Sequence, residues 1–273
     1  MIDPTIPICA TCAVEHADRR EVCAICADER QWVPAGGQRW TTLAELAADG
    51  RAVSISELEP GLHGVACSPG VGIGQQAKLV RTPHGNLLWD PIGYLDEAAV
   101  AAVRELGPVL AIAASHPHMY GVQVAWSHAL DGAAIYVNER QLAWLARPDP
   151  VVRPWAGACE PLPGVMLREL GGHFPGSSVV RFQGRDGSGV VLSSDTVFVN
   201  PDRTTVAFMR SFPNHIPLSP AVVRRLAAAL GEEPYERIYG NFDNAITAGA
   251  SEAVQRSAER HVAWAEGRFD DLT

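Results

Sequence analysis

The stretch VLAIAASHPH at residues 109–118 decides how this sequence is interpreted. Its first part, Val109–Ala113, is an apolar run without alternation, which is typical of a strand buried on both faces of a sheet. The run leads into Ser115-His-Pro-His118, so the strand delivers two imidazoles at its C-terminal end. A buried strand flanked by helical segments predicts an α/β fold with histidine chemistry at a strand end.

Helical and extended patterns alternate on both sides of this strand. Residues 96–106, which end before Gly107-Pro108, and residues 122–130 have helical periodicity. Residues 148–163 are rich in proline and are predicted to form a loop. The other predicted strands are residues 77–80, 87–89, 133–137, 165–170, 179–182 and 190–193, and the other predicted helices begin at Thr42 or cover residues 139–146, 221–230 and 252–266. This order predicts sheets with helices outside them.

The composition excludes several classes of protein. With 47% hydrophobic and 19% charged residues, the chain can form a core, which excludes disordered and collagen-like proteins. A length of 273 residues fits one large domain with a small appendage. The net charge of −9 gives no general attraction for phosphate backbones or anionic membranes. We therefore expect a small-molecule substrate rather than nucleic acid or a membrane as the partner, and a homo-oligomer stays open.

The sequence also predicts a cytoplasmic protein. The first residues, MIDPTIPICATC, lack the basic and apolar regions of a secretory signal. The stretch 106–130 carries no charged residue, but its glycines, prolines and histidines are not typical of a membrane span.

Four cysteines near the N-terminus form two C-x2-C pairs, Cys9 with Cys12 and Cys23 with Cys26. Each pair can present two thiolates from a tight turn to one tetrahedral zinc ion. The ten residues between the pairs are enough for a hairpin that brings them together. The pattern predicts a structural zinc ribbon, and iron in a rubredoxin-like site is the main alternative because the same ligands suit it.

This cysteine-rich extension is predicted to cover residues 1–43, with the main domain at residues 44–273. The extension has four basic and six acidic residues, a balance of four minus six, or −2. Because it lacks a basic face for phosphate contacts, we interpret it as a cap that packs on the main domain or on a partner subunit. We expect His16 within it to be a surface residue.

A further set of positions resembles the metallo-β-lactamase superfamily in order, spacing and placement at strand ends. They are Asp90, His116-Pro-His118, His173 in a Gly-Gly-His turn, and Asp195 in Ser-Ser-Asp-Thr. The resemblance runs from about Val65 to the C-terminal helix and implies an αββα sandwich with a metal cleft at one edge. Members of this superfamily hydrolyse thioesters, lactones, lactams and phosphodiesters, and others are oxidoreductases or have lost activity.

The departures from the family pattern concern its second metal. The family motif is H-x-H-x-D-H, whereas this chain has Tyr120 and Gly121 at the last two positions. The late histidine of the family is also missing, and Asn241 is its closest equivalent. The resemblance therefore implies a single metal, zinc or iron, held by three histidines: His116, His118 and His173.

Such a set of ligands has a clear chemical use. Three neutral imidazoles bind zinc with one open position, where the pKa of a bound water falls towards about 7. Asp195 resembles the bridging aspartate of the family, as a fourth ligand or as a general base for that water. Tyr120 is a second candidate catalytic residue, because its phenol can polarise a substrate carbonyl.

The remaining candidates have weaker support. Asp90 resembles the early structural aspartate of the family, which braces the metal loop. Asn241, Asp243, His84 and His215 are candidates for the cleft because they lie on predicted loops.

The sequence therefore favours a metal-dependent hydrolase of a small ester, thioester, lactone or amide, with a mononuclear tri-histidine site. One alternative is an inactive binding or scaffold protein with structural metals, which the lost second-site ligands favour. Another is a mononuclear iron oxidoreductase, because three histidines and a carboxylate hold Fe²⁺ as well as zinc.

Overall fold

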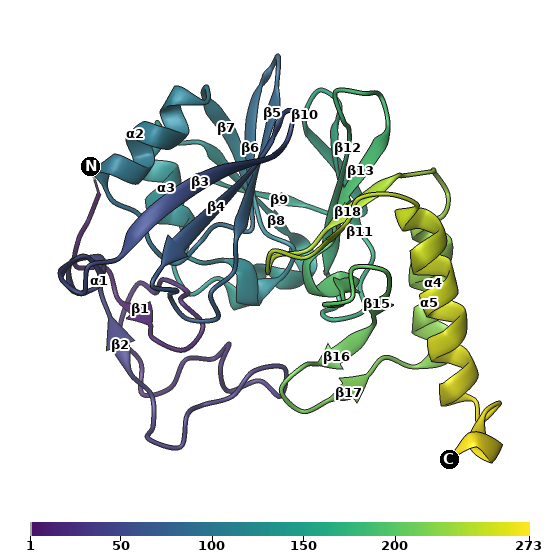
Figure 1. The fold of residues 1–273 in the computed structure, drawn as a ribbon. Coiled ribbons are helices and arrows are strands. Elements are labelled where there is room, and N and C mark those ends of the chain that lie inside the picture. Colours follow the sequence, from purple (N-terminus) through teal and green to yellow (C-terminus); the bar gives the residue numbers. More distant parts are fainter. Residues whose placement is uncertain (1) are drawn as a thin grey trace.

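The computed structural model describes residues 2–273, so Met1 at the start of the predicted extension lies outside it. Two large sheets pack face to face, with helices on both outer sides (Figure 1). This arrangement confirms the predicted α/β sandwich. The helices are α1 (Leu43–Ala48), α2 (Glu97–Glu105), α3 (Gln123–Ala129), α4 (Pro220–Leu230) and α5 (Ala250–Ala265).

The first sheet has seven strands in sequence order, β3 to β9. The pairs from β3 to β6 are antiparallel, and the pairs from β6 to β9 are parallel. Its strands are β3 (Ala52–Glu59), β4 (Leu62–Ser68), β5 (Ala77–Thr82), β6 (Gly85–Trp89), β7 (Val109–Ala113), β8 (Ala134–Asn138) and β9 (Val152–Trp155). Because β6 and β7 are parallel, their carboxyl ends meet at the same edge of the sheet, where Asp90 and His116 follow them.

The second sheet has six strands in the order β10-β11-β12-β13-β18-β19. All its pairs are antiparallel except β13 with β18. The strands are β10 (Ala158–Leu162), β11 (Val165–Glu169), β12 (Ser178–Gln183), β13 (Gly189–Leu192), β18 (Arg237–Tyr239) and β19 (Ala245–Ile246). The short strands outside the two sheets are β1 (Ile8–Cys9), β2 (Trp40–Thr41), β14 (Phe198–Val199), β15 (Val206–Ala207), β16 (Met209–Ser211) and β17 (Ile216–Pro217).

Apolar side chains fill three layers, as the alternating burial of the strands requires. Between the sheets, Trp89 and Ala113 of the first pack with Val180 and Leu192 of the second. Outside the second sheet, α4 and α5 close a further cluster. Outside the first sheet, residues of α2 and α3 share one cluster with Ile6, Ile8 and the four cysteines of the extension. The extension therefore packs on the main domain as the sequence predicts, whereas its boundary at residue 43 stays a prediction.

Two predicted elements are different in the structure. The predicted helix at residues 139–146 is a short 3₁₀ helix, Glu139–Trp144, whose first turn is capped by the side chain of Asn138. The predicted loop at residues 148–163 instead contains β9 and β10. Prolines are tolerated there because each of these strands lies at the edge of its sheet, where one row of backbone N–H groups needs no partner strand.

The extension crosses the end of the sandwich at which the carboxyl ends of β6 and β7 lie. It runs from β1, beside the first sheet, to the hairpin of β16 and β17, beside the second (Figure 1). Among residues 2–273, no helix has both the length and the apolar character needed to cross a bilayer.

Candidate metal centres

The four cysteines of the extension converge on one point. Their Sγ atoms all lie within 4.8 Å of one another and are buried. The Sγ atoms of Cys9 and Cys26 are 3.6 Å apart, and those of Cys12 and Cys23 are 3.8 Å apart. A tetrahedral ion with Zn–S bonds of about 2.3 Å requires S–S distances of about 3.8 Å. These two distances match a tetrahedral metal, and the other S–S distances are all within 4.8 Å.

Two side chains donate hydrogen bonds towards these thiolates. The Nε2 atom of Gln38 lies 3.2 Å from the Sγ of Cys9, and its Oε1 accepts from the backbone N–H of Cys23 at 3.1 Å. The Nε2 of His16 lies 3.4 Å from the Sγ of Cys23, and His16 is only 2% exposed. The prediction that His16 is a surface residue is wrong, because the ring supports a ligand from behind.

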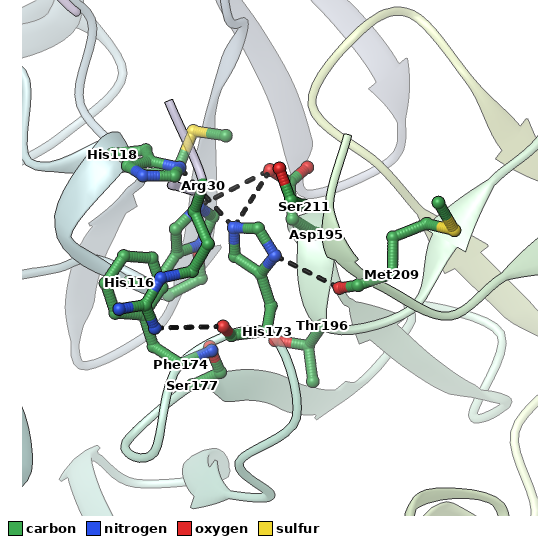
Figure 2. Close-up of polar contacts among 12 residues, drawn as sticks. Arg30, His116, His118, His173, Phe174, Ser177, Asp195, Thr196, Met209 and Ser211 are labelled. Atoms are coloured by element: carbon green, nitrogen blue, oxygen red, sulfur yellow. Dashed lines mark hydrogen bonds and ion pairs between the residues drawn. The ribbon is translucent and has the colours of Figure 1, made fainter. Parts of the chain in front are cut away.

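The second group of ligands comes from both sheets. His116 follows β7, and His118 lies in the 3₁₀ helix Pro117–Met119 directly after it. His173 lies in the turn between β11 and β12, and Asp195 lies in the 3₁₀ helix Ser194–Thr196 after β13. One nitrogen or oxygen of each residue lies within 4.8 Å of all the others. The structure thus brings together the four residues that the sequence predicts (Figure 2).

The spacing of these four donors also fits a tetrahedral ion. The Nε2 of His173 lies 3.4 Å from the Nδ1 of His118. The Oδ2 of Asp195 lies 3.4 Å from the Nε2 of His116 and 3.9 Å from the Nε2 of His173. Metal bonds of about 2.0–2.1 Å require edges of about 3.3–3.4 Å, which two of these three distances match, so the Oδ2 of Asp195 lies near a fourth vertex but farther from His173 than a regular tetrahedron requires. His116, His118 and His173 are at most 1% exposed, and Asp195 is 7% exposed.

In His116 and His173, the Nδ1 atom, which faces away from the ligand group, has a polar partner that orients the ring. The Nδ1 of His173 lies 3.1 Å from the carbonyl oxygen of Met209, to which it can donate its proton and leave Nε2 free for a metal. The Nδ1 of His116 lies 2.9 Å from the Oγ of Ser115. Burial, followed by the proximity of His116, lowers the pKa of His173 to about 3, so this ring is neutral at neutral pH. Within the described residues, the Nε2 of His116 and the Oδ1 of Asp195 are buried without a hydrogen-bond partner, which is typical of atoms that await a ligand.

Asp90 braces the loop that carries His116. Its carboxylate accepts from the backbone N–H of Ser115 at 2.6 Å, from the Oγ of Ser115 at 3.1 Å and from the Nδ2 of Asn241 at 2.6 Å. Burial raises the pKa of Asp90 to about 6, although these hydrogen bonds oppose the shift. Asn241 therefore supports Asp90, and the structure does not direct its amide into the ligand group.

The positions of the missing second-metal ligands have other uses. The hydroxyl of Tyr120 donates to the backbone carbonyl of Gln141 at 3.1 Å, and Tyr120 is 2% exposed. Its proton is therefore not available to a substrate, contrary to the predicted role in polarising a carbonyl. Gly121 has a φ of +51°, and a Cβ there would lie 2.1 Å from the carbonyl oxygen of Pro91. Histidine cannot be accommodated at this position, so the loop excludes that ligand.

The other cleft candidates lie outside the ligand group. His84 is in the hairpin before β6, at the opposite end of a five-residue strand from Asp90. That strand spans about 17 Å, so the prediction that His84 reaches the cleft is wrong. His215 is an exposed residue in the turn between β16 and β17. Asp243 is 82% exposed at its side chain and lies 3.7 Å from Arg203.

Sequence reasoning did not identify Arg30. Its Nη1 donates to the backbone carbonyl of His173 at 3.2 Å, and its guanidinium lies 3.6 Å from the centroid of the Phe174 ring (Figure 2). Nothing in the local sequence indicates this contact, because it joins residues that are 143 positions apart.

Comparisons with known proteins agree with this architecture. No protein-family model matches the chain. The uncharacterized protein YmaE of Bacillus subtilis strain 168 is 40% identical over 261 residues, covering 93% of this chain and 95% of that protein. The metallo-β-lactamase SMB-1 in complex with mercaptoacetic acid superposes with a TM-score of 0.53 at 18% identity, covering 81% of this chain and 97% of that chain. The metallo-β-lactamase FIM-1 from Pseudomonas aeruginosa in the mono-zinc form superposes with a TM-score of 0.53 at 15% identity, covering 77% of this chain and 96% of that chain. This chain therefore belongs to the same family as YmaE, has the fold of the metallo-β-lactamases, and carries a four-cysteine cluster near its N-terminus.

Proposed function

We propose that this protein is a metal-dependent hydrolase that uses a single metal, zinc, at the histidine site. Its substrates are small esters, thioesters, lactones or amides. The observation that carries the proposal is the convergence of three imidazole nitrogens and one carboxylate oxygen, all from buried residues and within 4.8 Å of one another, with the Nε2 of His116 left without a hydrogen-bond partner among the described residues. A metal held there supplies a Lewis acid for a carbonyl oxygen and lowers the pKa of a water.

Asp195 has two functions in this proposal. Its Oδ2 lies near the fourth vertex, 3.4 Å from the Nε2 of His116, so a water or a carbonyl oxygen would reach a metal there only by displacing this oxygen or as a fifth ligand. Its Oδ1 has no hydrogen-bond partner within the described residues, so it can accept a proton from a water that attacks a carbonyl carbon. The histidines hold the centre and do not transfer protons. We assign no proton transfer to Tyr120, because its hydroxyl already donates to Gln141.

The direction of substrate approach follows from burial. Asp195 is the most exposed of the four ligands, at 7%. Beside it, the Phe212 ring lies 5.9 Å from the His173 ring and 4.8 Å from Phe198, and Phe198 lies 6.0 Å from Phe242. Phe242 is 38% exposed, so this row of rings reaches the surface. We propose that the apolar part of a small substrate packs on these three phenylalanines while its carbonyl meets the metal.

A binding protein with structural metals is the second candidate. It is favoured by the near-complete burial of the three histidines and by the fourth ligand, since a closed coordination shell leaves no position for a substrate. An iron oxidoreductase is the third candidate, because the same donors suit Fe²⁺. The neighbour FIM-1 is described in a mono-zinc form, which supports zinc with one metal in this fold. A cytoplasmic location remains part of the proposal, since all six cysteines are free thiols and four of them converge on one candidate metal site rather than forming disulfides.

The test is a hydrolysis assay on the full chain with its metal content measured by plasma mass spectrometry. The panel contains nitrophenyl esters, acyl thioesters, lactones and anilides, each with small and with aromatic acyl groups. We expect turnover that is lost in His173→Ala and restored in the wild-type protein when zinc is returned after chelation. Zinc-loaded protein that is no faster than His173→Ala on every substrate would support the binding protein. Iron at this site together with dioxygen consumption would support the oxidoreductase.

A further inference from the structure

The cysteine extension reaches into the histidine site through one segment, Asp28–Arg30. Arg30 is 7% exposed and lies directly beside the loop that carries His173. Its Nη1 donates to the carbonyl of His173 at 3.2 Å, while its charged plane stacks on Phe174 at 3.6 Å. The extension therefore forms part of the wall of the second metal centre.

The Phe174 ring, on which Arg30 stacks, also packs against the rings of all three histidines. Its ring centroid lies 5.6 Å from that of His116, 5.0 Å from that of His118 and 5.2 Å from that of His173. Phe174 is fully buried, so its ring cannot move without displacing the imidazoles or the arginine above it. A change in the position of Arg30 therefore changes the packing around every imidazole ligand.

A second contact of the same segment acts on His173 from the other side. The Oγ of Ser211 and the Nδ2 of Asn214 each donate to the carbonyl oxygen of Glu29 at 2.7 Å. These residues belong to the β16–β17 hairpin, whose Met209 carbonyl accepts from the Nδ1 of His173 at 3.1 Å. Residues Asp28–Arg30 therefore contact the backbone carbonyl of His173 directly, and they also contact the hairpin whose Met209 carbonyl accepts the ring proton of His173.

The cysteine cluster fixes where this segment lies. Arg30 is four residues after Cys26, and two consecutive turns join them: Ala27 N–H donates to the Cys23 carbonyl at 3.0 Å, and Gln31 N–H donates to the Asp28 carbonyl at 3.0 Å. Asp28 holds the guanidinium through two oxygens, at 2.5 Å from Nε and 2.8 Å from Nη2. This bidentate pair also offsets the positive charge that Arg30 would otherwise place beside a metal cation.

We propose that Arg30 is a positioning residue through which the cysteine metal site sets the affinity and geometry of the histidine metal site. This proposal requires that the histidines bind a metal, but it does not require that the protein is a hydrolase. The two sites act as one unit: a filled cysteine site orders Asp28–Arg30, which in turn presents His173 and Phe174 in the ligating arrangement. Groups that support metal ligands from behind change affinity by about 10–100-fold when they are removed.

The test measures zinc affinity at the histidine site in the full chain with the cysteine site already filled, by competition with a chromophoric chelator. The variants are Arg30→Met and Arg30→Lys, and the matched control is Arg19→Met, which removes an exposed arginine of the same extension. We expect Arg30→Met to weaken zinc by about 10–100-fold. Arg30→Lys should lie between it and the wild type, because lysine can donate to His173 but cannot grip Asp28 with a planar fork. An affinity of Arg30→Met equal to that of Arg19→Met would overturn the proposal.

A spectroscopic readout separates positioning from a loss of folding. Cobalt at the histidine site should give a changed visible spectrum in Arg30→Met, while circular dichroism and the cobalt–thiolate bands of the cysteine site stay as in the wild type. Identical spectra at the histidine site would also overturn the proposal. For a variant that does not fold, Asp28→Asn provides the second test, since it leaves Arg30 in place but releases its orientation.

Thermodynamic linkage supplies a reciprocal experiment. If the cysteine metal strengthens binding at the histidines by some factor, the histidine metal must strengthen binding at the cysteines by the same factor. Emptying the cysteine site lowers the zinc affinity of the histidine site by some factor. His118→Ala should lower the zinc affinity of the cysteine site by the same factor, and an unchanged cysteine-site affinity would contradict the coupling. A chain that shows this coupling but hydrolyses nothing would refute the proposed function alone, and a hydrolase without it would refute this inference alone.

Discussion

The two candidate metal centres of this molecule have the same number of donor residues but arise from different parts of the chain. The cysteine ligands span residues 9–26 and come from two tight turns of one short segment. The histidine-site ligands span residues 116–195 and come from loops at the ends of β7, β11 and β13, in two different sheets. In both groups the donor atoms lie within 4.8 Å of one another.

This difference indicates that a metal at the cysteines would order its own segment, whereas a metal at the histidines would bind a site that the folded sheets already form. A segment as short as the extension has little core of its own, so its metal supplies folding energy. The histidine loops are held by thirteen strands, seven in one sheet and six in the other, and by the Asp90 network behind them. We therefore expect the loss of the first metal to change the fold and the loss of the second to change only the site.

The largest effect is expected for Cys26→Ser. The chain should lose one metal equivalent, and its unfolding free energy should fall by at least about 4 kcal/mol, because zinc and the shared core outside the first sheet are lost together. Metal content and thermal denaturation check this result. A variant that keeps its metal and its melting temperature would show that the cysteines are not a metal site.

His173→Ala is the matching change at the other centre. It should also remove one metal equivalent, but it should cost only about 1–3 kcal/mol, the usual range for a buried truncation. Hydrolysis of the best substrate should fall to the level of the chelated enzyme. Equal losses of stability in this variant and in Cys26→Ser would break the contrast between a site that folds its segment and one that is prepared by the sheets.

Asp90→Asn tests the bracing of the histidine loop with a smaller change. The new amide would direct N–H groups at the N–H of Ser115 or at the Nδ2 of Asn241, both of which are donors. We expect metal affinity at the histidines to fall by about 10–100-fold while the cysteine metal stays bound. Isothermal titration with zinc after chelation measures this change, and an unaltered affinity would mean that the sheets alone hold the loop.

The smallest effect is expected for Asp243→Asn, which serves as the control for the previous variant. This carboxylate is 82% exposed and its partner Arg203 is 61% exposed, so the pair contributes less than about 0.5 kcal/mol. Metal content and activity should stay at wild-type values. A lost metal equivalent would place Asp243 at the cleft, where the sequence made it a candidate.

The contrast between the centres also explains how far the sequence could be interpreted. The cysteine cluster was predictable because C-x2-C spacing brings thiolates together through local turns, whatever the rest of the chain does. The histidine set was predictable only by resemblance, since no local pattern joins His118 to His173 or Asp195. Parallel pairing places the ends of β7 and β13 at the edges of their own sheets, and the packing of the two sheets against each other brings these edges together.

The residues that sequence reasoning missed are those defined by contact alone. His16 had no ligand spacing to mark it, although its ring supports Cys23. Arg30 belongs to no motif, and only the packing of the chain places it over Phe174. Tyr120 stands where the family motif has an aspartate, and its hydroxyl donates to the backbone carbonyl of Gln141. Long-range packing decides each of these, and a single sequence carries no periodicity that reports it.

The most direct test of the account is anomalous diffraction from crystals of the full chain, recorded on both sides of the zinc and iron absorption edges. The account predicts two peaks: one among Cys9, Cys12, Cys23 and Cys26, and one among His116, His118, His173 and Asp195, the second showing the zinc edge. A third peak beside the histidines would contradict the single-metal site, and no peak among them would contradict the metal centre itself.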